Sequence, residues 1–563
     1  MKDALLARAR EHTAAIVTCV VAALFGIVSL TYPFGRDQGE YAAFADVVLK
    51  GLVPYRDVVN VKPPLAAAVH AAALVLFGRS MTSIRILDLA WTVGTSLAVY
   101  AFCHRAYRRR WAGVVAGLFY SYSYYLFYSP HTAQADGWLN LPVTLAMLAT
   151  VVAVEAAGRR ESARLGLGCL VAGGCVAIAM LFKYTMGLIL VTCGVFLFLE
   201  IPRDSARQAV GCFISGFLIP MVLAVGLLGA SSGLPAFIES QFTIVPGYAL
   251  VRTFRSPTVD LATMALFLLA NPGRGLAGPF AVARLYTMLP SVFKRGKCIG
   301  GGEWARSSDR LVLLWLVAAF ASLYAQGKFF NYHFLPVLPP LSIMAAQSLL
   351  RYLRPLWIRI NNSGLRAVLV LLVTLGLVAP TTYPARFAEA FALVAGRESL
   401  RDYWETGEFE YWEPPESDIP GFSLGGQLAL VDYLQGQTDP TDTVFIWVSE
   451  PLIYFLTGRR IVSRHIAIYE LASVWAPEEW RRELIDELLA SPPALFIVVH
   501  NDHNLCVLGH NKDSYTTFLE FPALHEFVDR CYEFEARVDR FDVYRLRADQ
   551  DCCSEVRSAE RDD

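Results

Sequence analysis

Residues 14–41 read AAIVTCVVAALFGIVSLTYPFGRDQGEY, an uncharged apolar run followed at once by a short polar stretch. The apolar part, 14–31, is long enough to cross a hydrocarbon core of about 30 Å as a helix. Lys2, Arg8 and Arg10 precede it, as in a secretory signal, but the run is longer than usual for one and further apolar blocks follow. We therefore expect a retained first membrane span with a polar loop behind it.

The composition of the whole chain also indicates a membrane protein. Of the 563 residues, 55% are hydrophobic and 18% are charged, and the mean hydropathy is +0.42. A soluble domain usually carries about 25% charged residues. The formal net charge is −1, so no bulk charge attracts nucleic acid and we expect no nucleic-acid partner.

Ten of the eleven cysteines fall into two groups along the chain, and Cys298 lies apart from both in a lysine-rich loop. In the polar C-terminal part, Cys506, Cys531, Cys552 and Cys553 show no metal-type spacing, and a disulfide there is compatible with an extracytoplasmic location. Six of the eleven lie in or beside apolar blocks, where cysteine behaves as a small hydrophobe: Cys19, Cys103, Cys169, Cys175, Cys193 and Cys212.

Loop charges orient the apolar blocks, because lysine and arginine are retained on the cytoplasmic side. If every block crossed the membrane, the arginine run at 108–110 and all later basic loops would fall outside. The 64–77 block has only 14 residues and begins at Pro63-Pro64, so we expect an interfacial or re-entrant helix there. The twelve blocks lie at 14–31, 64–77, 82–103, 111–129, 137–157, 165–182, 184–201, 208–230, 259–290, 310–325, 333–350 and 366–382.

The predicted architecture is therefore a polytopic α-helical membrane protein of about eleven spans with a cytoplasmic N-terminus. Residues 1–383 form the membrane module, and 384–563 form a small α/β domain outside the cytoplasm, with strands near 443–448, 494–500 and 541–546 and a helix at 477–490. The 259–290 block is broken at 271–273. It is either one kinked span with an interfacial piece or a pair of spans, and a pair would reverse the side of the C-terminal domain.

The first outer loop, 32–81, carries an acidic stretch and a cationic end. It begins Asp37-Gln38-Gly39-Glu40-Tyr41 and continues to Lys62-Pro63-Pro64-Leu65. Asp37 and Glu40 share one face if the stretch is helical, and a carboxylate at the membrane surface suits a general base. The alternative is a solvated acidic pair that caps a helix. Between the two ends lies Pro54-Tyr55-Arg56-Asp57.

Further polar side chains fall on the same outer side. His131 and Asp136 lie in the turn at 130–136, Lys183 interrupts two apolar blocks, and Lys328 and His333 flank an aromatic stretch. Positioned cations stabilise a phosphate leaving group. The alternatives are an N-cap for Asp136, a surface histidine, a snorkelling lysine and an interfacial aromatic belt. The stretch at 500–503, with two histidines and an aspartate, has no third ligand placed by sequence and is expected to be an ordinary polar loop.

With these motifs the sequence resembles the polytopic C-type (GT-C) glycosyltransferases, and more closely bacterial members of glycosyltransferase family 39. This group is related to protein O-mannosyltransferases and lipid A aminoarabinose transferases. The matching features cover most of residues 14–350, and the first outer loop is the specific part. The resemblance implies a polyprenyl-phosphate-linked sugar donor, inversion at the sugar, and action at the outer face of the cytoplasmic (inner) membrane among its lipids.

The resemblance also implies roles for individual residues. Asp37 would be the catalytic base, with Glu40 and Asp136 supporting it or positioning the acceptor. Many relatives carry Asp-Glu where this chain has Asp37-Gln38, which leaves open whether the supporting carboxylate is Glu40, Asp57 or neither. No cofactor is implied, and a divalent metal is not favoured. The expected substrate-binding residues are Tyr41, Tyr55, Arg56, Asp57, Lys62, His131, Lys183, Lys328 and His333.

Two other classes of protein compete with this interpretation. A lipid or glycan transporter or flippase predicts charges near mid-membrane and related halves of the chain, whereas the notable charges here lie at the outer ends of spans. An oligosaccharide ligase or polymerase is typically organised around a long, late outer loop, whereas the strongest acidic loop here is the first. The acceptor stays open among protein, lipid A and another envelope glycan.

Overall fold

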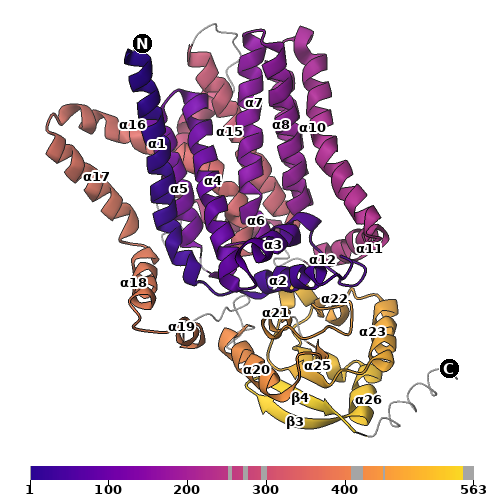
Figure 1. The fold of residues 1–563 in the computed structure, drawn as a ribbon. Helices are drawn as coiled ribbons and strands as arrows, with labels where there is room; N and C mark the ends of the chain where they lie inside the picture. The colour runs from indigo at the N-terminus through magenta and orange to yellow at the C-terminus, as the bar shows by residue number, and fades with distance from the viewer. Residues whose placement is uncertain are drawn as a thin grey trace.

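The computed structural model describes residues 2–127, 129–251, 256–269, 277–292, 301–406, 422–447 and 450–548. A bundle of long helices stands on a smaller domain that contains the β-strands (Figure 1). The N-terminal end of α1 (Lys2–Gly26) and the C-terminal domain lie at opposite ends of the bundle. This arrangement agrees with the predicted placement of the two on opposite sides of a membrane.

Within the described residues, seven helical segments are long and apolar enough to cross a membrane, and a bent pair gives an eighth. The bent pair is α17 (Ser363–Val378) with α18 (Tyr383–Val394), at 89° to each other. The seven are α1 with η1 (Ile27–Thr31), α4 (Met81–Tyr107), α6 (Ala135–Trp138) with α7 (Asn140–Gly158), α8 (Ser162–Phe182), α10 (Arg203–Ala230), α15 (Gly301–Gln326), and η6 (Asn331–Val337) with α16 (Leu338–Arg359).

Shorter helices correspond to the remaining predicted blocks, so the chain is a multi-pass membrane protein and the count of eleven spans stays a prediction. The block at 259–290 is two helices, but residues 270–276, which include the expected break, lie outside the described residues. These shorter helices are α5 (Arg110–Leu126), η3 (Tyr184–Met186) with α9 (Gly187–Glu200), α13 (Pro257–Leu269) and α14 (Ala277–Val292).

Two helices of the first outer loop lie across the end of the bundle that faces the C-terminal domain (Figure 1). They are α2 (Arg36–Leu49) and α3 (Pro64–Phe77), and α3 is the 14-residue block that the loop charges excluded from the spans. Pro64 opens α3 because proline lacks the amide hydrogen that the first helical turn leaves unpaired. The same end carries η2 (Ser129–His131), α11 (Leu234–Glu239), η4 (Ser240–Ile244) and α12 (Val245–Leu250).

The C-terminal domain contains a four-stranded sheet of order β1-β2-β4-β3. β1 (Val444–Trp447) runs parallel to β2 (Leu495–Val499), while β4 (Phe541–Leu546) is antiparallel to β2 and to β3 (Tyr532–Val538). Three predicted strands and the predicted helix are confirmed. β3 was missed because charged residues alternate with apolar ones along this edge strand and leave no continuous apolar run. The helices after the membrane module are α19 (Leu400–Thr406), α20 (Leu424–Gln437), α21 (Leu452–Thr457), α22 (Tyr469–Ala472), α23 (Glu478–Ala490), α24 (Leu505–Leu508), α25 (Ser514–Leu519) and α26 (Pro522–Cys531).

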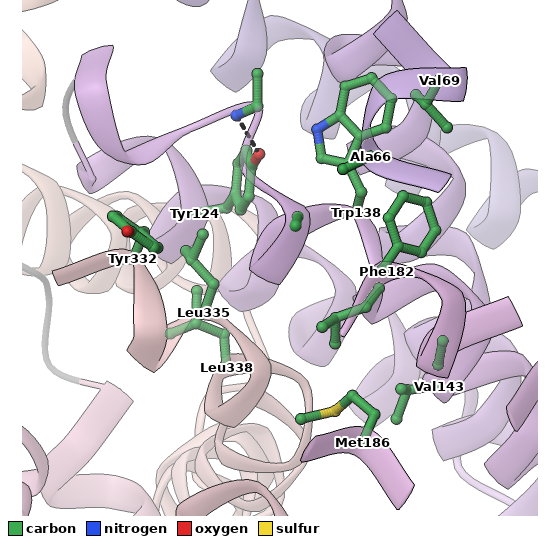
Figure 2. Close-up of a cluster of buried hydrophobic side chains, with 14 of the residues drawn as sticks. Ala66, Val69, Tyr124, Trp138, Val143, Phe182, Met186, Tyr332, Leu335 and Leu338 are labelled. Carbon is green, nitrogen blue, oxygen red and sulfur yellow. Dashed lines mark hydrogen bonds between the residues drawn. The ribbon is translucent and has the colours of Figure 1, made fainter. Parts of the chain in front are cut away.

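A buried arginine fixes the two outer turns to each other. Arg85 of α4 donates to the Tyr32 carbonyl at 3.1 Å, the Ser129 carbonyl at 3.1 Å and the Thr132 hydroxyl at 2.9 Å. Buried hydrogen bonds from a charged donor are stronger than those between neutral groups. Beneath these turns, α6, α8 and η6 contribute Trp138, Phe182 and Leu335 to a buried hydrophobic cluster (Figure 2). The ends of the first and second outer loops therefore stand on a rigid base.

Candidate active site

Asp37 lies in the first turn of α2, where the helix dipole favours a negative charge. One carboxylate oxygen accepts a hydrogen bond from the Gln134 amide at 3.2 Å, and the side chain is partly exposed. The carboxylate is thus oriented by the second outer turn and still reachable from outside the protein. This geometry suits a group that takes a proton from an incoming molecule.

Gln38 holds the start of α2 against the second outer turn. Its amide nitrogen donates to the Ser129 carbonyl at 3.1 Å and to the Thr132 carbonyl at 2.7 Å, and its oxygen accepts from the Gly35 amide at 3.0 Å. The side chain is fully buried. A carboxylate cannot donate hydrogen bonds, so glutamine is the residue that this position needs.

Glu40 is the second acidic residue of α2, and it is 5% exposed. Within the described part of the chain its Oε1 atom has no hydrogen-bond partner. Burial raises the pKa of the Glu40 carboxyl to about 8, with Lys62 opposing the rise and Asp37 and Glu470 adding to it. At neutral pH Glu40 therefore carries a proton and is uncharged. Asp37 thus has no second negative charge from Glu40 beside it.

Lys62 faces Glu40 from the end of the first outer loop. Among the residues that the structure describes, no hydrogen bond or ion pair occupies its ammonium group. Tyr55 holds the Lys62 backbone, because its hydroxyl donates to the Lys62 carbonyl at 2.8 Å. The Tyr55 ring packs between Phe44 and Phe237 with centroid distances of 5.6 and 4.9 Å. Tyr55 thus positions Lys62 from within the core.

The structure does not bring Arg56 and Asp57 to this cluster. They form an ion pair with each other at 2.7 Å, and the Arg56 side chain is 52% exposed. Asp57 also accepts from the Val53 amide at 2.8 Å, which closes the local turn. Of the two residues left open as the supporting carboxylate, Glu40 is therefore the one that lies beside Asp37.

Asp136 and Lys183 form an ion pair near Asp37, and the Lys183 side chain is 16% exposed. The Lys183 ammonium lies 2.8 and 2.6 Å from the two oxygens of Asp136. Asp136 is 2% exposed and opens α6, while Lys183 ends α8. Lys183 also lies near Lys62 and Asp37, whose charges act on it. The expected snorkelling alternative does not apply, because the ammonium is held inside the protein.

The remaining predicted cation and the two histidines lie farther along the same face. Lys328 is buried and donates to the backbone carbonyls of Val251 and, at 2.6 Å, Cys506, with its ammonium 4.1 Å from the Tyr248 ring centroid. It therefore joins the C-terminal domain to α12. His333 is buried, and the positive charges of Lys183, Lys62 and Lys328 act on its ring. His131 lies 3.3 Å from the Asn331 amide.

Aromatic side chains from four separate elements surround the charged groups. Tyr41 of α2 is buried beside His70, with ring centroids 5.1 Å apart, and its hydroxyl is near Asp37, Glu40 and Asp136. Tyr332 of η6 and Tyr469 of α22 are close enough to Asp37 for its charge to act on their hydroxyl groups. Tyr248 of α12 lies near both tyrosines. Tyr332 belongs to the aromatic stretch between Lys328 and His333, but it was not singled out as a site residue. Tyr248, Tyr469 and Glu470 lie in no motif and meet the site only through the fold.

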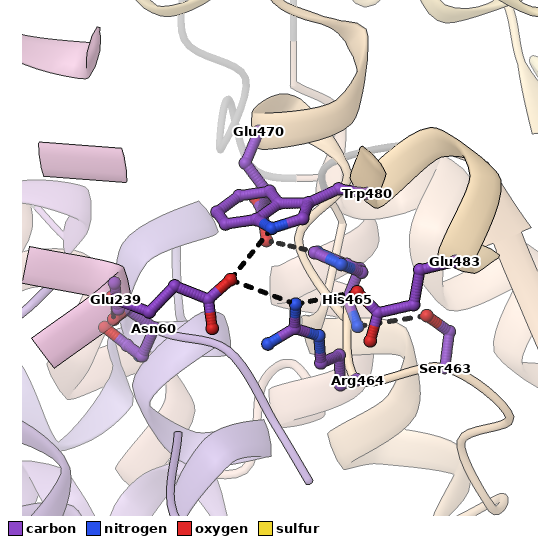
Figure 3. Close-up of polar contacts among 9 residues, drawn as sticks. Asn60, Glu239, Ser463, Arg464, His465, Glu470, Trp480 and Glu483 are labelled. Atoms are coloured by element: carbon purple, nitrogen blue, oxygen red, sulfur yellow. Dashed lines mark hydrogen bonds and ion pairs between the residues drawn. The ribbon is translucent and has the colours of Figure 1, made fainter. Parts of the chain in front are cut away.

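The C-terminal domain is seated directly on the first outer loop. Arg36 of α2 forms an ion pair with Glu450 at 2.8 Å. The Val59 amide donates to the Arg464 carbonyl at 2.8 Å. Figure 3 shows the neighbouring polar contacts, in which Arg464 and Trp480 meet Glu239 of α11. A Cβ atom at Gly39 would lie 2.6 Å from the Leu452 Cβ atom, so α2 and α21 touch through a glycine.

The described residues contain no group of three or more His, Cys, Asp or Glu side chains that could hold a metal ion. In the stretch at 500–503, His500 contacts Asp542 at 2.7 Å and Asp502 accepts from Ser514 at 2.7 and 2.6 Å. The polar-loop interpretation agrees with these separate partners. Independence from a metal or other cofactor stays a prediction.

A helical membrane bundle with acidic first and second outer loops beneath a small α/β domain is the architecture of a C-type glycosyltransferase. The solved structure of ArnT from Cupriavidus metallidurans in the apo state has this fold: TM-score 0.56, 14% identity, and coverage of 94% of this chain and 97% of that chain. The same protein bound to undecaprenyl phosphate gives a TM-score of 0.53 at 15% identity, with 95% and 98% coverage. Archaeal AglB from Archaeoglobus fulgidus, in complex with an inhibitory peptide and a dolichol-phosphate, gives 0.51 at 13% identity, with 95% and 74% coverage.

Residues 61–228, less than half of the chain, match the family model described as dolichyl-phosphate-mannose-protein mannosyltransferase. No curated protein matches the sequence. The fold and the family match confirm the class predicted from the sequence, a polytopic C-type glycosyltransferase. At such low identity the solved structures establish the shared fold and not the roles of single residues.

Proposed function

We propose that this protein transfers a single sugar from a polyprenyl-phosphate donor to an acceptor at the outer face of the cytoplasmic membrane. The observation that carries the proposal is the meeting of Asp37, Glu40, Lys62 and the Asp136–Lys183 pair at one end of the bundle. The bound undecaprenyl phosphate of ArnT and the dolichol-phosphate of AglB support a lipid-phosphate leaving group on this fold.

The proposed reaction is a direct displacement with inversion. The Asp37 carboxylate takes the proton from the acceptor hydroxyl or amine, whose oxygen or nitrogen then forms a bond to the anomeric carbon. The bond between that carbon and the phosphate oxygen breaks, and the phosphate leaves with the electron pair. Lys62 is the cation that would meet the phosphate, since Lys183 is already paired with Asp136.

Two observations support the outer side of the membrane as the location of the site. The N-terminal end of α1, which contains Lys2, Arg8 and Arg10, lies at the opposite end of the bundle from the C-terminal domain. Cys531 in that domain is disulfide-bonded, and disulfides persist in oxidising compartments outside the cytoplasm. Nucleotide sugars are not normally available there, which favours a lipid-linked donor.

Mass spectrometry of envelope glycans, lipids and glycoproteins from cells that lack the gene tests the proposed function. The expected result is the loss of one single-sugar modification, restored when the gene is returned. Loss of a whole preassembled oligosaccharide would instead indicate a ligase or polymerase. An unchanged set of modifications, with a lipid-linked intermediate accumulating on the cytoplasmic side, would indicate a flippase.

A further inference from the structure

Glu470 of α22 is an acidic residue of the C-terminal domain that lies inside the protein, 1% exposed. Its Oε1 atom lies 3.3 Å from Nδ1 of His465, which is equally buried (Figure 3). Its second oxygen, and Nε2 of His465, have no hydrogen-bond partner among the residues described here. Buried polar atoms are nearly always hydrogen-bonded, so these unpaired atoms point to a ligand.

Glu40 faces this group from the membrane module. Its Oε1 atom is also buried and lacks a partner in the described part of the chain. The two carboxyl groups are close enough for the charge of Glu470 to act on Glu40, and both act on Tyr469 between them. The contact of Gly39 with Leu452 fixes the two halves of the protein against each other. Two carboxyl groups, each with one unpaired oxygen among the residues described, therefore converge from two domains.

The cluster has a cationic end, where Lys62 and Lys183 are close enough for their charges to act on each other. Glu40 lies next to that end, because the charge of Lys62 also acts on it, and Glu470 approaches Glu40 from the C-terminal domain. In an inverting displacement the acceptor approaches the anomeric carbon from the side opposite to the leaving phosphate. If the phosphate lies against Lys62, the acceptor enters from the side of Glu470.

We propose that Glu470, together with Glu40, binds the acceptor through hydrogen bonds to the hydroxyl groups of a sugar ring in an envelope glycan. This inference rests on the proposed function. Burial raises the pKa of both carboxyl groups to about 8, so at neutral pH each is a neutral acid. A neutral carboxyl group offers one donor and further acceptors, which matches the hydroxyl groups of a sugar. The C-terminal domain would thereby form one wall of the active site.

The test compares two substitutions in the full-length protein. Glu470→Gln keeps a donor and an acceptor in the same volume, so the single-sugar modification in cells should stay within about threefold of wild type. Glu470→Leu removes both, so the modification should fall on the order of tenfold or more. Glu483→Leu is the matched control, because Glu483 pairs with Arg464 in the same part of the domain and is 38% exposed; it should leave the modification unchanged.

Two further measurements separate binding of the acceptor from a purely structural role. Undecaprenyl phosphate should bind the purified Glu470→Leu protein as it binds wild type, because the cationic end is intact. The thermal midpoint of that variant at pH 8 should equal or exceed the wild-type midpoint, since removing an unsatisfied buried carboxyl relieves the folded state. A structural role predicts a lower midpoint.

Several results would overturn the inference. Equal loss of the modification in both Glu470 variants would mean that a charge is required, as for an amine acceptor. Full activity of both would remove Glu470 from the site. Linkage analysis that places the added sugar on an amine or a protein side chain would contradict a sugar hydroxyl as acceptor. Failure of the proposed function can be told apart from failure of this inference, because the modification would then also persist in the Asp37→Asn variant.

Discussion

Replacement of Glu40 by glutamine should stabilise the protein, and the gain should grow with pH. Burial raises the pKa of Glu40 to about 8 in the folded state, against an ordinary value of 4.5. The folded state therefore holds a proton that the unfolded state releases, and stability is lost as pH rises from 4.5 through 8. Each pH decade in that window costs about 1.4 kcal/mol. Glutamine at this position does not ionise, so the variant does not lose this part of its stability as the pH rises.

The size of the effect follows from these two pKa values. The advantage of Glu40→Gln should be under about 1 kcal/mol at pH 5 and about 4 kcal/mol at pH 8, the latter an upper bound because the unfolded chain retains some structure. In a protein of this size we expect a rise in the thermal midpoint on the order of 5 °C at pH 8. Unfolding of both proteins in lipid nanodiscs, followed by intrinsic fluorescence at pH 5 and pH 8, measures the difference.

The same pair of measurements can refute the reasoning. A difference between the two midpoints that is the same at both pH values would show that Glu40 is ionised, or solvated, in the folded protein. A Glu40→Gln protein that is less stable at pH 8 would show that the carboxylate has a cationic partner in the folded state. Glu470 titrates in both proteins and therefore largely cancels in the comparison.

Four further substitutions test the contacts of individual residues at this end of the bundle. Asp136→Asn leaves the Lys183 ammonium without its counter-charge and should lower the free energy of unfolding by about 3 to 5 kcal/mol. Adding Lys183→Met should recover most of that loss. No recovery would mean that the broken ion pair is not the cause. Gln38→Glu removes two hydrogen bonds to backbone carbonyls of the second outer turn, each worth about 1 to 3 kcal/mol, so both the thermal midpoint and sugar transfer should fall. Arg56→Ala should change neither the thermal midpoint nor transfer, because the Arg56 side chain is 52% exposed and forms its ion pair with the adjacent Asp57. Loss of transfer in this variant would return Arg56 to the site.

The fold was largely predictable because its signals are local. The lengths of the apolar blocks and the side on which the basic loops fall indicated the spans, and they also excluded 64–77, which forms α3. The strands β1 and β2 were visible as apolar runs with buried side chains, and β4 as a short stretch rich in aromatic and branched residues. The edge strand β3 was missed, because its apolar residues alternate with charged ones and are mostly not buried.

The charged members of the site were found from the sequence, but their partners were not. Lys183 and Asp136 are 47 positions apart, and only the packing of α6 against α8 makes them a pair. Lys328 was expected to face the donor phosphate, whereas it donates to the Val251 and Cys506 carbonyls in the structure. Glu470 lies in a short helix without a motif, and its place beside Glu40 depends on how the C-terminal domain docks on α2.

The Glu-to-Gln departure from the family pattern at position 38 also has a structural explanation that the sequence could not supply. Gln38 meets carbonyl oxygens more than 90 positions away, so its need for a donor is set by tertiary structure. The sequence likewise left open whether Glu40 or Asp57 lies beside Asp37. In the structure Asp57 accepts from the Val53 amide and pairs with Arg56, so it lies apart from Asp37.

The most direct test of the central claim is the activity of Asp37→Asn. Membranes from cells that lack the gene are supplied with wild-type or Asp37→Asn protein at equal amounts, and the single-sugar modification is measured by mass spectrometry. If Asp37 is the base, the variant should fold normally, bind undecaprenyl phosphate like wild type and give no modified product. Normal levels of product from the Asp37→Asn protein would contradict the assignment of the outer face around Asp37 as the active site.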